Sequence, residues 1–285
     1  MKISTEIGSA AHILGERRTV ELVAGAGFDA WDFSMFTMVQ FEDGVLLEGG
    51  HPLRTAEALK FARELKKIGL DNGIVCNQSH APYPVNCKAV RDCLCRAIEC
   101  TAEAGGSICV IHPDNYKGPE ENAQMYLELL PFAKACGVKL AAENMWCWDS
   151  AEDHACFAAC ATPESFLAHL NAVNDPDLVA CLDVGHAEMR GLGTSAPEII
   201  RALGKRIAAL HLHDNDRWHD SHQLPFSMQI DFDAIVRALK QIGYSGWFTL
   251  EADAYLNAFD ADTVDRGLRN MEQAARKLAG LFEAC

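Results

Sequence analysis

The feature that most constrains the fold of this chain is a regular alternation of short apolar runs with longer amphipathic stretches. In stretches such as TAEALKFARELKKIG and DFDAIVRALKQIG, apolar residues recur at helical spacing. The apolar runs expected to be strands are KIST at the start, FDAWDFS near residue 30, GIVCNQS near 75, SICVIH near 109, VKLAAEN near 141, DLVACLDV near 180, IAALHLHD near 210 and WFTLEA near 249. Near-continuous apolar strands that alternate with helices predict a parallel sheet covered by helices.

Eight such strand–helix units in a chain of 285 residues predict an α/β fold of the (β/α)8 type, a TIM barrel. The main rival is an open, doubly wound sheet, but the dinucleotide fingerprint G-x-G-x-x-G does not follow the first predicted strand. No linker or shift in composition divides the chain, so we expect one domain over residues 1–285. We also expect Gly69, Gly137 and Gly243 to end helices just before the next strand.

The balance of charges limits the partners of this chain. Lys and Arg total 25 and Asp and Glu total 40, which gives a formal net charge of -15. Nucleic acids are bound largely through Lys and Arg, so a nucleic-acid partner is not expected. The first residues, MKISTEIGSAAHILGERR, hold no apolar run typical of a secretory signal, and no segment approaches the length of a membrane span. We therefore expect a cytoplasmic protein with no membrane partner and with most of its 12 cysteines reduced, and homo-oligomers are compatible with such a barrel.

Histidines and carboxylates follow six consecutive predicted strands at the same end. In a TIM barrel the chemistry is carried at the C-terminal ends of the strands. These strand-end residues are His80, His112, Glu143, Asp183 with His186, His211 with His213, and Glu251. Each of them alone has an ordinary structural explanation, but Glu143, Asp183 and Glu251 would converge on one barrel mouth. Since two unit charges about 4 Å apart repel by roughly 4 kcal/mol at an effective dielectric near 20, three such carboxylates require a cation or shared protons.

The motifs SHAP, IHP, AAEN, LDVGH, HLHDND and TLE, in this order, resemble those of the xylose isomerase-like barrel superfamily, also called AP endonuclease family 2. The similarity covers nearly the whole chain, and members include sugar isomerases, ketose 3-epimerases, inosose-pathway enzymes and endonuclease IV-type nucleases. The resemblance to the epimerase branch implies one divalent metal ion, Mn2+, Co2+, Mg2+ or Zn2+. Its implied ligands are Glu143, Asp183, His211 and Glu251. The spacing H-x-x-D favours His211 as the histidine ligand, whereas some members use the residue two further on, which is His213 here.

These residue types imply proton transfer on a small sugar or sugar phosphate. A divalent ion that holds a carbonyl and a hydroxyl oxygen makes the adjacent C–H acidic and stabilises an enediolate. One carboxylate removes the proton and another returns it, and Glu143 and Glu251 are the expected pair. The expected substrate contacts are His80, His112, His186, His213 and Trp146, and further candidates for stacking on a sugar are Trp148, Trp31 and Phe33.

Two other interpretations of the same residues stay open. An inosose dehydratase-like lyase could use the same ion and the same acid–base pair to expel a hydroxide. An endonuclease IV-type nuclease binds three zinc ions through additional ligands. The candidates for these ligands are His80, His112, His186, Asp220 and His222. The negative net charge and the form of the LDVGH motif favour the sugar enzyme.

Overall fold

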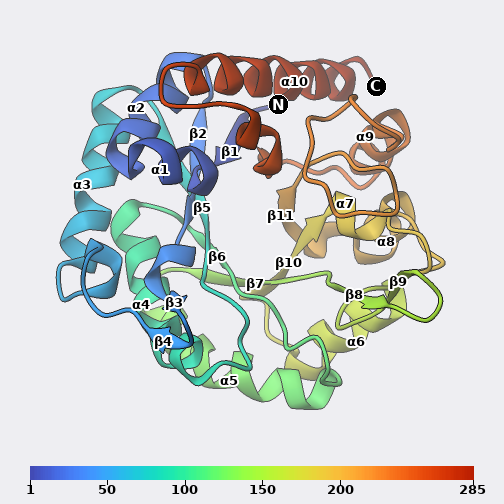
Figure 1. Cartoon of the computed structure of the whole chain (residues 1–285). Coiled ribbons are helices and arrows are strands. Elements are labelled where there is room, and N and C mark those ends of the chain that lie inside the picture. The colour runs from blue at the N-terminus through green and yellow to red at the C-terminus, as the bar shows by residue number, and fades with distance from the viewer.

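Eight parallel strands form a ring in the computed structural model, which describes all 285 residues (Figure 1). They are β1 (Ile3–Glu6), β2 (Ala30–Ser34), β5 (Val75–His80), β6 (Ile108–Val110), β7 (Lys139–Glu143), β10 (Leu178–Asp183), β11 (Ile207–His211) and β12 (Phe248–Leu250). From β1 to β11 each strand pairs with the next one along the chain, and β1 also pairs with β12. Leu212 N–H donates to Thr249 O and Glu251 N–H to Leu212 O, which links the β11 side to the β12 side. The predicted barrel and all its predicted strands are confirmed.

Helices connect the strands on the outside of the ring. The main ones are α2 (Glu16–Ala26), α3 (Ala58–Asp71), α4 (Lys88–Ala104), α5 (Pro119–Ala135), α6 (Pro163–Val173), α8 (Ala196–Leu203), α9 (Phe232–Gln241) and α10 (Val264–Ala284), with short helices α1 (Gly8–Leu14) and α7 (Val184–Ala187) and 3-10 turns η1 (Phe36–Met38), η2 (Pro52–Arg54), η3 (Gly204–Arg206) and η4 (Ala254–Ala258). Their apolar faces pack on the outer side of the strands in one large core. None of these helices combines the length and the apolar character needed to cross a bilayer.

Apolar residues fill the inside of the ring beneath the polar residues at the strand ends. Val110, Ala141, Val179, Cys181 and Ala209 form a separate buried cluster drawn from four neighbouring strands. Because side chains alternate along a strand with period two, Glu143, Asp183 and His211 share a face with Ala141, Cys181 and Ala209. These three polar residues therefore cap the apolar interior of the barrel at its C-terminal end.

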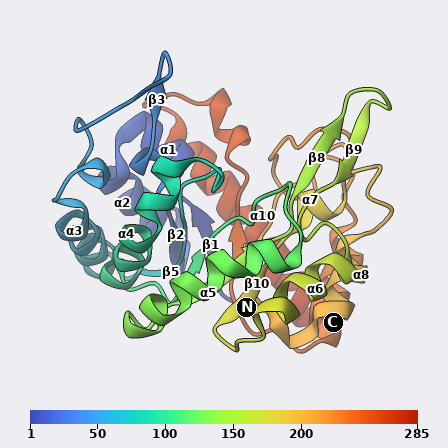
Figure 2. The same cartoon turned by 90° about the horizontal axis from the view of Figure 1, so that it is seen from below.

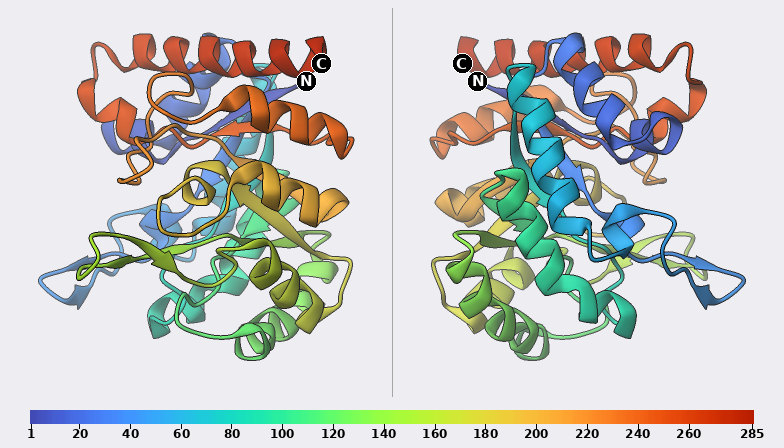
Figure 3. Two further views of the ribbon diagram at one scale, coloured as in Figure 1. Left: turned by 90° about the vertical axis from the view of Figure 1, so that its right-hand side faces the viewer. Right: turned by 90° about the vertical axis from the view of Figure 1, so that its left-hand side faces the viewer.

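Two β-hairpins were not predicted from the sequence. The first pairs β3 (Phe41–Glu42) with β4 (Val45–Leu46), and the second pairs β8 (Trp146–Asp149) with β9 (His154–Phe157). Both project from the same side of the barrel, away from the chain termini (Figures 2 and 3). These strands are short, β3 and β4 are exposed, and β8 and β9 are only partly buried, so they lack the continuous apolar run on which strand prediction depends.

Two of the three predicted helix-ending glycines are placed as expected. Gly137 and Gly243 follow α5 and α9 with φ of +70° and +68°, a left-handed conformation that suits glycine. The prediction for Gly69 is wrong, because α3 continues to Asp71 and Gly73 makes the left-handed turn. Gly69 instead lies against the barrel, where an added Cβ would lie 2.9 Å from the indole nitrogen of Trp31.

Candidate active site

Four of the predicted site residues meet at the barrel mouth. Glu143, Asp183 and His211 end β7, β10 and β11, and Glu251 directly follows β12. One side-chain donor atom from each of the four lies within 4.8 Å of all the others. Nδ1 of His211 lies 3.1 Å from Oε1 of Glu143 and 3.2 Å from Oε2 of Glu251. The structure thus brings together the set of four that the family resemblance implied, including the three carboxylates whose convergence the strand ends predicted.

The donor atoms of this cluster suit a divalent metal ion. Glu143 is 1% exposed, Asp183 0% and Glu251 7%, so all three carboxylates are removed from water. Oδ2 of Asp183 is buried and makes no hydrogen bond, and Oε2 of Glu143 has only the ring nitrogens of His80 and His112 nearby, at 3.3 Å and 3.2 Å. Burying a carboxylate is costly unless a hydrogen bond or a cation compensates it. Three carboxylate oxygens and one imidazole nitrogen are ligands that Mn2+, Co2+ and Zn2+ accept.

Neighbouring charges shift the two glutamates of the cluster in opposite directions. Burial raises the pKa of Glu143, but the charges of His211 and His112 outweigh it and hold that pKa well below its usual range. Burial, reinforced by the charge of Glu143, keeps the pKa of Glu251 well above its usual range. Burial lowers the pKa of His211, yet Cys181, Glu251 and Glu143 raise it well above its usual range. In the metal-free protein a proton on His211 therefore balances the negative charge of Glu143.

The ring of His211 is oriented by a carboxylate behind it. Its Nε2 lies 3.4 Å from Oδ2 of Asp32, and this oxygen also accepts a hydrogen bond of 2.9 Å from Gln78. A partner on the far ring nitrogen is how proteins fix the nitrogen that faces a metal. Asp32 lies inside β2, not at its end, so the search of strand ends missed it. The signal for it was a carboxylate between two large apolar residues, Trp31 and Phe33, inside a predicted strand.

His213 belongs to a second group of donors. Its Nε2 lies 3.2 Å from Oδ1 of Asp183 and 3.6 Å from Oδ1 of Asp220, and its ring stacks on His222 with centroids 3.9 Å apart. His186, His213, Asp220 and His222 offer donor atoms within 4.8 Å of one another. The segment that contains Asp220 and His222 thus folds into the mouth.

The glycine of the LDVGH motif makes room for this second group. A Cβ on Gly185 would lie 1.9 Å from Cε1 of His213, a distance that no side chain tolerates. Gly185 lies in the short helix α7, which begins where the Oδ1 of Asp183 accepts a 2.6 Å hydrogen bond from the N–H of His186. The carboxylate of Asp183 therefore both caps this helix and belongs to the group that it forms with Glu143, His211 and Glu251.

His80 and His112 form a third group around Glu143. Their Nε2 atoms lie 2.9 Å apart, and these atoms lie 3.3 Å and 3.2 Å from Oε2 of Glu143. Burial lowers the pKa of His112 to about 4, against the opposing charge of Glu143. Tyr83 stacks on His112 with ring centroids 5.0 Å apart. Glu143 therefore faces the central cluster with one oxygen and this histidine pair with the other.

His186 and Trp146 form the wall on the other side of the mouth. Nδ1 of His186 lies 2.9 Å from the carbonyl oxygen of Asn144, and its Nε2 lies 3.1 Å from Oδ2 of Asp220. Burial lowers the pKa of His186, but Asp183 and Asp220 raise it to about 10. The indole N–H of Trp146 donates to Oδ2 of Asp220 over 3.2 Å. Asp220 thus connects two of the predicted substrate contacts.

Other predicted aromatic contacts lie elsewhere. Trp148 is 40% exposed on the β8–β9 hairpin, with its ring centroid 6.4 Å from that of Trp146. Trp31 and Phe33 are fully buried and pack against each other in the core. The suggestion that they stack on a sugar is therefore wrong, because both side chains are buried in the core and no solvent reaches them.

An open cavity of about 710 Å3 lies beside the clusters, between β1, β2 and the segment after β12. Glu6, Ser34, Phe36 and Asp253 are among the residues that line it. Phe36 packs edge-on against His80, and Asp253 lies 3.0 Å from Nδ1 of His222, so the cavity adjoins two of the three groups. Burial, with Asp253 and Asp32 nearby, raises the pKa of Glu6 to about 8. Glu6 directly follows the KIST run, and the strand-end rule would have found it.

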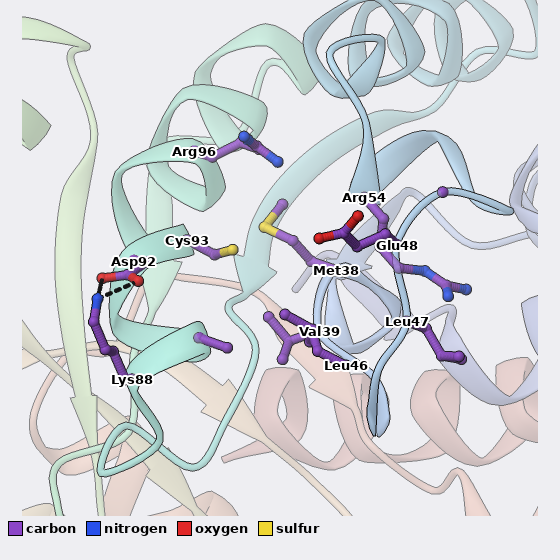
Figure 4. A pocket seen from close by; sticks show the side chains of 12 residues that line it. Met38, Val39, Leu46, Leu47, Glu48, Arg54, Lys88, Asp92, Cys93 and Arg96 are labelled. Atoms are coloured by element: carbon purple, nitrogen blue, oxygen red, sulfur yellow. Dashed lines mark hydrogen bonds and ion pairs between the residues drawn. The ribbon is translucent and has the colours of Figure 1, made fainter. Parts of the chain in front are cut away.

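Another cavity, of about 600 Å3, lies between the β3–β4 hairpin and α4 (Figure 4). It is lined by Met38, Val39, Leu46, Leu47, Glu48, Gly49, Arg54, Lys88, Ala89, Asp92, Cys93 and Arg96. Lys88 donates to Asp92 within it. No residue of the three donor groups lines this cavity, so it is not part of the candidate active site.

Comparison with known proteins agrees with this architecture. The family described as xylose isomerase-like TIM barrel matches residues 20–280. An uncharacterized protein of Methanocaldococcus jannaschii is 27% identical over 251 residues, which cover 82% of this chain and 78% of that protein. Among solved structures, a D-tagatose 3-epimerase-like protein superposes with a TM-score of 0.73 at 21% identity, over 100% of this chain and 99% of the other. An L-ribulose 3-epimerase gives 0.70 at 19% identity over 100% and 95% of the two chains, and the IolI protein with a zinc atom gives 0.69 at 19% over 100% and 99%.

Proposed function

The chain belongs to the xylose isomerase-like TIM barrel family, and from this premise we propose that it is a divalent-metal-dependent isomerase or epimerase of a small sugar or sugar phosphate. The observation that carries the proposal is the meeting of Glu143, Asp183, His211 and Glu251 within 4.8 Å of one another. The likeness in fold to proteins named as sugar 3-epimerases supports it.

In this proposal Glu143, Asp183, His211 and Glu251 hold one Mn2+, Co2+, Mg2+ or Zn2+ ion. When bound, such an ion supplies Lewis-acid polarisation of the substrate's carbonyl group. The ion pair between Nε2 of His211 and Oδ2 of Asp32, 3.4 Å apart, orients the imidazole so that Nδ1 faces the ligand cluster.

Glu143 and Glu251 are the proposed acid–base pair. Glu143 ends β7 and Glu251 directly follows β12, and β10 and β11 lie between them around the ring. The two side chains would therefore reach a bound substrate from different sides. The lowered pKa of Glu143 keeps this carboxylate ionised, as a group that accepts a proton must be. Return of the proton to the same carbon gives an epimer, and return to the neighbouring carbon gives an isomer.

The remaining polar groups of the mouth position the substrate in this proposal. His80 and His112 lie on the Glu143 side, whereas His186, His213 and Trp146 lie on the Asp220 side. The four histidines have ring nitrogens that can donate to or accept from sugar hydroxyl groups, and the indole N–H of Trp146 can donate to them.

The test is a screen of free and phosphorylated ketoses and of inososes in D2O, with each metal ion added, followed by NMR. We expect deuterium to enter the carbon next to the carbonyl of one substrate. Glu143→Gln and Glu251→Gln should each abolish this exchange, whereas Glu128→Gln, on an exposed side chain of α5, should not affect it. Exchange retained in both site variants would remove them as the acid–base pair. A product that has lost water would instead identify a dehydratase using the same residues.

A second candidate function is phosphoester hydrolysis with three metal ions. It is favoured by one observation, that the groups His80–His112–Glu143 and His186–His213–Asp220–His222 adjoin the central cluster. The net charge of -15 argues against a nucleic-acid substrate. Elemental analysis of zinc-loaded protein distinguishes the two, since about one ion per chain supports the isomerase and three ions with nicking of abasic DNA support the nuclease.

A further inference from the structure

The β8–β9 hairpin places two cysteines directly opposite each other. In its antiparallel register Cys147 pairs with Cys156, between the pairs Trp146–Phe157 and Trp148–Ala155. Directly opposed residues of an antiparallel pair have Cα atoms about 4.5 or 5.5 Å apart, and their side chains lie on the same face. Disulfides span Cα separations of roughly 4.4 to 6.8 Å. The backbone thus already holds these cysteines at a separation that a disulfide can bridge.

Both thiols are free and half-buried, so reagents in solution can reach them. Burial raises the pKa of Cys156, and the nearby Cys147 raises it further, which agrees with the two sulfurs being close. The sulfur of Cys147 also lies 3.9 Å from Nδ2 of Asn115, an amide that donates to the carbonyl oxygen of Trp146.

No other strand register of the protein pairs two cysteines. Cys76, Cys100, Cys109, Cys160 and Cys181 are buried. Cys93 and Cys95 are two residues apart on α4, and helix positions at this spacing do not face each other. Cys147 and Cys156 are therefore the cysteines best placed for an intrachain bond.

We propose that Cys147 and Cys156 are a redox modification site, which a low-molecular-weight disulfide such as oxidised glutathione converts into a cross-strand disulfide. One cysteine thiolate attacks the glutathione disulfide, forms a mixed disulfide and releases one glutathione thiol. The second thiolate then attacks the protein sulfur of that mixed disulfide and releases the second. The two cysteines lose two electrons and their protons, and one glutathione disulfide becomes two glutathione thiols.

This bond would form on the hairpin face that does not carry Trp146. Side chains alternate along a strand, so Cys147 points away from the face on which Trp146 reaches Asp220. The disulfide therefore fastens the two strands of the hairpin without displacing Trp146 from the mouth. The disulfide thereby links the redox state of the surroundings to the rigidity of the hairpin that carries Trp146. This inference does not depend on the proposed function.

The test uses the full-length protein equilibrated with mixtures of reduced and oxidised glutathione, then alkylated, unfolded and digested after glutamate. Cleavage after Glu143, Glu152 and Glu164 places Cys147 on the peptide 144–152 and Cys156, with Cys160, on the peptide 153–164. We expect these peptides to be joined, with the loss of two hydrogen atoms, and to separate after dithiothreitol.

Cys147→Ser and Cys156→Ser should each abolish the joined peptides and leave a glutathione adduct on the remaining cysteine. Cys95→Ser, which removes an exposed thiol of α4, is the matched control and should leave the joined peptides unchanged. Joined peptides that persist in Cys156→Ser would assign the bond to Cys160 and overturn the proposal. Glutathione adducts on both cysteines, with no joined peptides at any ratio, would overturn it as well.

Discussion

Removal and return of a divalent ion should change the thermal stability of this protein strongly. Glu143, Asp183 and Glu251 are buried with donor oxygens within 4.8 Å of one another. At that separation each pair of unit charges repels by about 3.5 kcal/mol at an effective dielectric near 20, so three ionised carboxylates would cost on the order of 10 kcal/mol. This is comparable with the whole free energy of unfolding of a typical protein, about 5–15 kcal/mol. Protons on His211 and Glu251 relieve this repulsion in the metal-free protein, and an ion would relieve it better.

The expected gain follows from mass action. The four ligands come from β7, β10, β11 and the residue after β12, so only the folded barrel presents them together. An ion at a free concentration 100 times its dissociation constant then stabilises the folded state by about 2.7 kcal/mol. For a chain of 285 residues we expect the midpoint of thermal unfolding to rise by about 4–5 °C.

The assay is thermal unfolding followed by circular dichroism, in a chelator and then with excess Mn2+, Co2+, Mg2+ or Zn2+. Glu143→Gln should lose most of the shift, and Glu128→Gln should keep it. An equal rise of the midpoint in Glu143→Gln, or no rise with any ion in the unmodified chain, would refute the assignment of these ligands.

Other predictions test single residues. His211→Asn should abolish the ion-induced rise in the unfolding midpoint, whereas His213→Asn should keep most of it, because only His211 faces both Glu143 and Glu251; the reverse result would make His213 the ligand. Ion binding near pH 7 should release about two protons, measured by calorimetry in buffers of different ionisation enthalpy, because the raised pKa values of His211 and Glu251 keep both groups protonated beforehand. The pKa of Glu6 is raised from 4.5 to about 8, so the folded state retains a proton that the unfolded chain loses, and stability falls as pH rises from 4.5 to 8. In urea unfolding at pH 8, the free energy of unfolding of Glu6→Gln should therefore exceed that of the parent by roughly 2–4 kcal/mol. At pH 4 the two proteins should be equally stable, and an equal effect at both pH values would contradict this. Gly185→Ala should cost more than about 2 kcal/mol of unfolding free energy, because its Cβ would overlap His213 at 1.9 Å; a neutral result would show that His213 moves freely.

The spacing of the apolar runs predicted the barrel, and the polar residues at the ends of these runs predicted which side chains meet at its mouth. Parallel strands buried on both faces leave apolar runs of recognisable length, and their C-terminal ends must meet at one mouth once the ring closes. Glu143, Asp183 and His211 each end such a run, and Glu251 follows one, so their convergence could be inferred without coordinates.

The orientation of these residues and their surroundings are visible only in the three-dimensional structure. His211 and His213 lie on the same face of one segment, and only their contacts across the ring, with Asp32 and Glu143 or with Asp183 and Asp220, distinguish them. The hairpin that carries Trp146 and opposes Cys147 to Cys156 left no apolar run to detect. Such contacts join residues far apart in the chain, and their geometry depends on the packing of the whole barrel, which local patterns of sequence do not encode.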